Sequence, residues 1–74
     1  MTDTNVYRVT EIVGSSDQGI DHAVRGALER AGKTLRHLEW FEVESIRGSI
    51  TTPGAAPTVQ VTMKVGFRLE DPEG

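Results

Sequence analysis

The fold of this chain is decided by one stretch near its C-terminus, residues 58–69, which reads TVQVTMKVGFRL. Apolar side chains alternate along it with polar or small ones, and they are Val59, Val61, Met63, Val65, Phe67 and Leu69. Because successive side chains of a strand point to opposite faces of a sheet, this pattern predicts one apolar and one polar face. At ~3.3 Å per residue, such a strand reaches roughly 40 Å.

A second strand begins near Leu38, and its apolar pattern changes phase midway. Phe41 and Val43 share one face, and the other face carries Trp40, Glu42 and Glu44. Past Ser45 the apolar positions shift by one residue, to Ile46 and Ile50. A slip of this kind predicts a β-bulge near Glu44 and Ser45. The bulge would bring three more side chains to the face of Trp40, namely those of Ser45, Arg47 and Ser49.

The rest of the chain supplies a first strand, a helix and a turn. Residues 6–13, VYRVTEIV, favour a strand that ends at Gly14. Ser15 and Gln18 have capping-box spacing, which predicts a helix from Ser16 to about Leu35. Its apolar stripe consists of Ile20, Val24, Ala27, Leu28, Ala31 and Leu35. Residues 51–57, TTPGAAP, are typical of a turn. The predicted order is β-α-β-β, an α+β fold.

The length of the chain predicts self-association. Its 74 residues make a single domain, 1–74, with an ordered core of about 5–70. Domains of this size usually add disulfides, metals or oligomeric contacts to a marginal core, and this chain has no cysteine. The last two strands would also outrun a 20-residue helix of ~30 Å. We therefore expect a neighbouring subunit to cover part of the sheet.

Composition argues against several classes of function. A net charge of −3 and a pI near 5.2 are unlike the basic excess of nucleic-acid-binding domains. No apolar run approaches the ~20 residues that span a membrane, and the polar start is unlike a signal peptide. A cytoplasmic protein is therefore expected. His22 and His37 suggest neither a metal cluster nor a catalytic arrangement, and an enzyme is not expected.

Trp40 is the strongest candidate for a functional residue. It is the only tryptophan, and its predicted neighbours on that face are glutamates. Such an aromatic either packs into a subunit interface or forms a stacking platform for a planar ligand, and both can hold together. Gln60, Arg47 and Arg68 share the predicted face. The glutamine is either a solvated strand residue or a partner for the edge of a heterocycle, which its amide suits, whereas an arginine can hold phosphate, stack on a ring or pair with a surface glutamate.

Four segments of the chain closely resemble bacterial dodecins. They are residues 6–14, 35–43, 46–48 and 60–70, which read VYRVTEIVG, LRHLEWFEV, IRG and QVTMKVGFRLE. The similarity runs from about Asn5 to Asp71. The connection at residues 51–57 is rich in Pro and Ala, and Val59 stands where relatives often carry an aromatic residue.

The resemblance implies a ligand and an assembly. Three antiparallel strands would curl around the helix, and twelve subunits would form a hollow particle with flavins stacked between tryptophans at subunit interfaces. Trp40 matches the stacking tryptophan and Gln60 the glutamine at the pyrimidine edge. Three further positions match residues near the flavin, namely Arg47, Arg68 and Ser49. Some bacterial members also hold coenzyme A, which Arg30 and Lys33 would serve.

The function implied by the resemblance is storage without turnover. The flavin (FMN, riboflavin or FAD) would be sequestered and its photochemistry quenched by Trp40. The alternative is a structural oligomer without a cofactor, in which Trp40 is buried between subunits.

Overall fold

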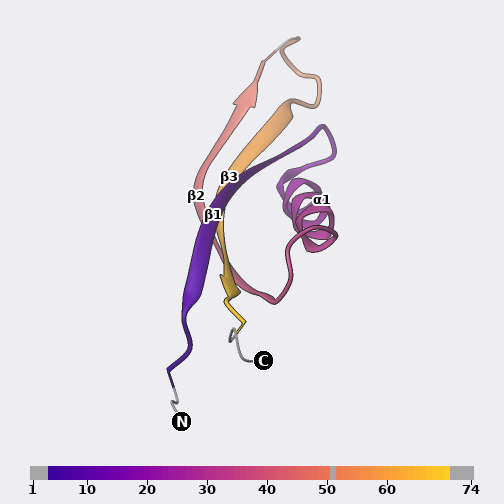
Figure 1. Ribbon diagram of the computed structural model, residues 1–74. Helices are drawn as coiled ribbons and strands as arrows, with labels where there is room; N and C mark the ends of the chain where they lie inside the picture. The colour runs from indigo at the N-terminus through magenta and orange to yellow at the C-terminus, as the bar shows by residue number, and fades with distance from the viewer. Residues whose placement is uncertain (1–3, 51, 71–74) are drawn as a thin grey trace.

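The computed structural model describes residues 4–50 and 52–70. Within them the chain forms strand β1 (Tyr7–Ser16), helix α1 (Ile20–Gly32), strand β2 (Leu38–Ser49) and strand β3 (Thr58–Arg68). The strands make one antiparallel sheet in the order β1-β3-β2, with α1 against one face (Figure 1). The predicted β-α-β-β fold is confirmed.

Strand β3 is the centre of the sheet and of the core. Its residues pair with β1 on one side and with β2 on the other. Val61, Met63 and Val65 are fully buried beneath α1, as the alternation predicts. We call the face that carries these three residues the inner face and the opposite one the outer face.

Helix α1 packs on the inner face of β1 and β3. The approach is closest at Gly14 of β1, where an added Cβ would collide with the carbonyl oxygen of Ala23 and the Cβ of Ala27. Both ends of the sheet extend past the helix (Figure 1), and β2 and β3 have 12 and 11 residues. The inner face of β2 therefore keeps its apolar side chains exposed, among them Phe41, Val43 and Ile46. No helix within the described residues is long and apolar enough to cross a membrane.

The predicted start of the helix is wrong. Strand β1 continues through Ser16, which pairs with Val59, so these residues are not available to a helix. The Ser16 hydroxyl accepts a hydrogen bond from the Gln18 amide at 2.9 Å and closes a turn. The helix then begins at Ile20 after Gly19, whose φ of 109° favours glycine, and no side chain caps it.

The predicted end of the helix is also wrong. The helix stops at Gly32, and the Leu35 amide still donates to the carbonyl of Ala31 at 2.9 Å. His37 lies beyond the helix in a left-handed conformation (φ 62°), where the chain turns into β2. It therefore belongs to the connection before β2 and not to the helix.

Strand β2 contains two bulges rather than one. The predicted bulge is confirmed at Glu44, because Val43 pairs with Met63 and Ser45 with Thr62. A second irregularity lies at Glu39, between the pairs Leu38–Phe67 and Trp40–Gly66. The irregularity places Leu38 on the same inner face as Phe41, whereas Trp40 alternates regularly with Phe41 and lies on the outer face. The sequence could not reveal it, because a single strand residue precedes it.

The turn between β2 and β3 contains a tight reversal at Pro53 and Gly54. The Ala55 amide donates to the carbonyl of Thr52 at 3.0 Å, and Gly54 has a φ of 90°. These features are those of a type II turn, in which proline precedes a residue with positive φ. Thr51, the first residue of the predicted turn, lies outside the described residues.

Candidate functional site on the outer face of the sheet

Trp40 lies across the central strand on the outer face. The Cε2, Cζ2 and Nε1 atoms of its indole occupy the place that a Cβ of Gly66 would take. The indole therefore has a partner within its own subunit, the backbone of β3 at Gly66. The residue is still 42% exposed. One part of the ring thus rests on protein, and the rest is free to contact a ligand or a second chain.

A small polar cluster adjoins Trp40. Glu39 accepts hydrogen bonds on both carboxylate oxygens, from the Tyr7 hydroxyl at 3.0 Å and from Arg68 Nε at 3.3 Å. The hydrogen bond to Glu39 raises the pKa of Tyr7 above its usual value, with smaller contributions from burial and from the carboxylate charge. The cluster holds the bulged residue Glu39 and places Arg68 at the Trp40 end of the outer face.

Three other predicted site residues lie together farther along the sheet. Arg47 pairs with Gln60, and its Nε donates to the Gln60 Oε1 at 3.0 Å. With Ser49 they line a cavity of about 140 Å³, completed by Gly48 and Thr58. A glutamine with a free amide nitrogen beside an arginine presents several donors in one place, which suits a ligand rich in acceptors.

The two groups of predicted site residues are well separated. Gln60 lies six positions before Gly66 on β3, a distance of roughly 20 Å along an extended strand. Trp40 and Arg68 therefore form one part of the outer face, and Arg47, Ser49 and Gln60 form another. The prediction that all five share one face is confirmed, but the sequence did not reveal this separation. A single planar ring system cannot contact Trp40 and Gln60 of the same subunit at once.

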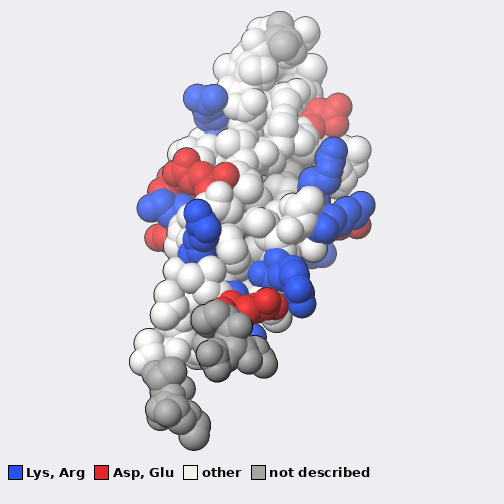
Figure 2. Space-filling model, in the orientation of Figure 1, with Lys and Arg blue, Asp and Glu red and all other residues white. Residues whose placement is uncertain are grey.

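Charged side chains fill the space between these two groups. Lys64 Nζ lies 3.2 Å from the Glu44 carboxylate. A hydrogen bond between the Glu11 and Glu44 carboxyls, together with their repulsion, raises the pKa of Glu11. The same hydrogen bond and the contact with Lys64 lower the pKa of Glu44. Figure 2 shows acidic and basic side chains interspersed over the middle of the molecule. Within the described residues, no group of three His, Cys, Asp or Glu side chains is arranged to hold a metal.

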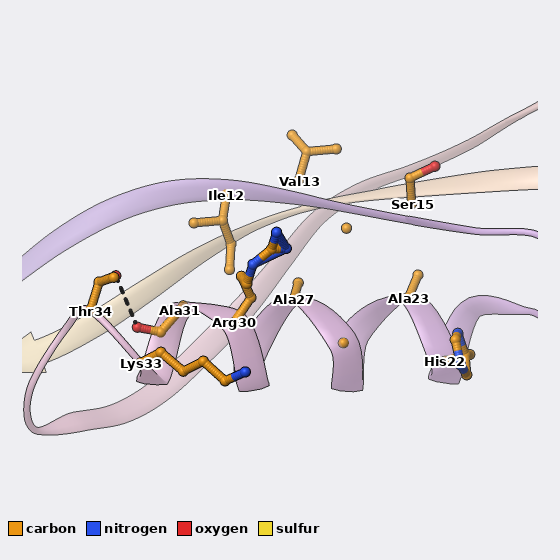
Figure 3. Close-up of a pocket in the computed structure, with 12 residues that line it drawn as sticks. Ile12, Val13, Ser15, His22, Ala23, Ala27, Arg30, Ala31, Lys33 and Thr34 are labelled. Carbon is orange, nitrogen blue, oxygen red and sulfur yellow. Dashed lines mark hydrogen bonds between the residues drawn. The ribbon is translucent and has the colours of Figure 1, made fainter.

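A second concave feature lies between α1 and β1 (Figure 3). It is a groove of about 560 Å³. Small residues of the helix line it, namely Ala23, Gly26, Ala27 and Ala31. Arg30 and Lys33, the candidates for holding coenzyme A, both line this groove. In Figure 3 the Arg30 side chain rises from the helix toward β1, beside Ile12.

Both histidines have partners that the sequence did not reveal. His22 Nδ1 shares a hydrogen bond of 2.8 Å with the Ser16 hydroxyl, at the turn that joins β1 to α1. His37 Nε2 donates to the Glu70 carboxylate at 2.7 Å, and Arg36 lies 3.3 Å from the same oxygen. These contacts lower the pKa of Glu70, with the His37 hydrogen bond as the largest cause. Both arrangements tie segments of the chain together and belong to neither part of the outer-face site.

The fold and the outer face together define a small α+β protein with an aromatic surface suited to a planar ligand. The family model described as Dodecin matches residues 6–70 of the chain. The chain is 53% identical over 66 residues to the dodecin of Thermus thermophilus, a match that covers 89% of this chain and 94% of that protein. The chain therefore belongs to the dodecin family of small ligand-binding proteins.

Solved structures support the same assignment. The dodecin from Streptomyces davaonensis has a TM-score of 0.85 and 49% identity, covering 93% of this chain and 100% of that one. The dodecin from Streptomyces coelicolor has a TM-score of 0.85 and 51% identity, covering 95% and 99%. The β-α-β-β arrangement described above is the one these dodecins share.

Proposed function

We propose that this dodecin binds a flavin (FMN, riboflavin or FAD) and stores it without turnover. The observation that carries the proposal is the position of Trp40, whose indole rests on Gly66 while the residue stays 42% exposed. An aromatic ring supported on one side by protein is ready to stack on a planar ring system. Stacking on an isoalloxazine would permit fast electron transfer from the indole, which would quench the excited flavin.

The separation of the site residues supports a site shared between subunits. Trp40 would stack on the flavin, and Gln60 would bond the pyrimidine edge. Since roughly 20 Å separates these two residues within one chain, the flavin would take Trp40 from one subunit and Gln60 from another. Arg47 and Ser49 would accompany Gln60, and Arg68 would lie beside the stacked ring.

We propose that twelve copies assemble into a hollow particle. Phe41, Val43 and Ile46 on the inner face of β2 are partly exposed, and an assembly would cover them. In the alternative reading the protein is a structural oligomer without a ligand, and Trp40 is buried between subunits. The proposed compartment is the cytoplasm, where free flavin would be buffered.

Titration of FMN with the purified protein, followed by flavin fluorescence, tests the proposal. We expect the emission to fall to a small fraction of its initial value, and Trp40→Ala to abolish most of this quenching. Arg25→Ala is the matched control, because Arg25 pairs with Asp21 on the exposed side of α1. Undiminished emission at saturating protein would exclude flavin stacking and favour the structural oligomer. A native mass measurement gives the number of subunits and of bound flavins.

We propose coenzyme A as a second ligand, held in the groove between α1 and β1. The groove supports this because its volume is about 560 Å³ and two cationic side chains, Arg30 and Lys33, line it. Their charges would attract the phosphates of the ligand. We expect calorimetry to detect binding of coenzyme A to the native protein and at least tenfold weaker binding to the double variant Arg30→Ala/Lys33→Ala. FMN binding should be unchanged in that variant.

A further inference from the structure

Gly66 stands at a position where a strand normally carries a side chain. It is buried near the C-terminal end of β3, and a glycine within a strand weakens it, because it gives up packing and raises the entropy cost of folding. Its backbone does not require glycine: among the described residues only Gly19 and Gly54 are glycines with positive φ. The reason for glycine at position 66 must therefore be space.

The space above Gly66 is filled by the Trp40 indole. A Cβ at position 66 would overlap three ring atoms, and the Nε1 atom would lie 2.6 Å away. Gly48, the glycine of β2, makes a useful comparison. A Cβ there would have the carbonyl oxygen of Thr58 at 3.2 Å as its nearest neighbour, which a small shift relieves. Among the glycines of the described residues, Gly66 alone has an aromatic ring in the place of its missing side chain.

Two features of the sheet thus act together on the tryptophan. Trp40 lies on the outer face because it alternates with Phe41 on the inner face, and hydrogen bonds from Tyr7 and Arg68 hold Glu39, the bulged residue just before it. Gly66, which pairs with Trp40 across the strands, then leaves the backbone of β3 bare for the ring. With any side chain at position 66, the indole would have to rise from the sheet or turn away from it.

We infer that Gly66 is a positioning residue for Trp40: it lets the indole lie against β3, and it thereby sets the orientation in which the ring meets a ligand. Gly66 acts through the tryptophan and is not itself a contact for the ligand. The effect on flavin binding rests on the proposed function, whereas the packing of the indole does not.

A double-mutant cycle with Trp40→Ala and Gly66→Ala tests the packing in flavin-free protein. In the native chain we expect Gly66→Ala to lower the Tm by several degrees and to shift the tryptophan emission to longer wavelength. In the Trp40→Ala background the same substitution should leave the Tm unchanged or raise it, because alanine suits a strand better than glycine when there is room. If Gly66→Ala alone fails to fold, recovery in the double variant still supports the inference. Equal Tm changes in both backgrounds, or unchanged emission, would overturn it.

The flavin-bound protein supplies the second readout. We expect Gly66→Ala to weaken FMN binding at least tenfold while the mass of the assembly is unchanged. Gly32→Ala is the matched control, because a Cβ at that position meets nothing within 4 Å. If the native protein binds no FMN, the proposed function fails, and the cycle still decides the role of Gly66. If Gly66→Ala binds FMN as well as the native protein does, the positioning role is wrong while the proposed function stands.

Discussion

The inner faces of β3 and β2 carry the same kind of side chain and have opposite surroundings. Val61, Met63 and Val65 of β3 are 0% exposed. Their direct partners on β2 across the sheet, Ile46, Val43 and Phe41, are 50%, 40% and 46% exposed. The cause is the position of the helix, which packs on β1 and β3 and leaves the inner face of β2 open.

The apolar residues on the inner face of the sheet thus have two different roles. The apolar residues of β3 hold the subunit together, because α1 covers them. Those of β2 form a contiguous exposed patch, and such patches mark contacts with other chains more often than free surface. The alternation in sequence shows which face is apolar, but it does not show whether the same chain covers that face.

The largest effect on stability is expected in the core of the subunit, on the inner face of β3. Met63→Ala removes a fully buried side chain from the centre of β3, and such truncations cost about 2–5 kcal/mol of unfolding free energy. Met63→Leu, which nearly conserves volume, should cost less than about 1.5 kcal/mol. Urea unfolding of both variants measures the difference. Equal costs for the two would show that the site is less tightly packed than its burial indicates.

A different kind of effect is expected on β2. Phe41→Ala should weaken the assembly more than the fold of the subunit, because Phe41 is 46% exposed within its own chain whereas its partner Val65 is fully buried. We expect a smaller sedimentation coefficient at low protein concentration, and a Tm that rises with protein concentration more steeply than in the native protein. The far-UV circular dichroism should be retained. Loss of secondary structure with no change in association would instead place Phe41 in the core of the subunit.

The sequence predicted the fold to a large extent, because most of the evidence was local. The alternation of residues 58–69 identified the central strand, and the phase slip near Ser45 identified the Glu44 bulge. The predicted start of α1 was wrong because pairing between Ser16 and Val59, which lie 43 positions apart, overrode a local capping signal. Tertiary contacts of this kind leave no trace in local spacing.

The sequence predicted that the candidate site residues share one face of the sheet, but it did not predict their positions along that face. All five site residues share the outer face, yet the structure divides them into the Trp40 and Gln60 groups. The contact of the indole with Gly66 was also missed, since it depends on the pairing of β2 with β3, which brings together residues 26 positions apart. A glycine within an otherwise regular strand was the one signal that could have revealed it.

The smallest effect is expected in the charged centre of the outer face, where the carboxyl groups of Glu11 on β1 and Glu44 on β2 interact across β3. The pKa of Glu11 is raised by its hydrogen bond with Glu44 and by their repulsion. The protonated Glu11 side chain therefore stabilises the fold at low pH, and this stabilisation is lost as the pH rises through the raised pKa. The ionised side chain opposes folding. Glu11→Gln should raise the Tm slightly at pH 7, and the gain should vanish below the usual carboxyl range.

Glu44→Gln tests the other member of this carboxyl pair, and the expected change in Tm has the opposite sign. The pKa of Glu44 is lowered by the hydrogen bond with Glu11 and by the contact with Lys64. Its carboxylate therefore supports folding at neutral pH, and this support is lost as the pH falls through the lowered pKa. We expect Glu44→Gln to lower the Tm slightly at pH 7 and to match the native protein in acid. Both changes should shrink in high salt, because these exposed charges are screened. Tm values measured from pH 3 to pH 8 check the two signs, and the same sign for both variants would show that the two carboxyls do not share a proton.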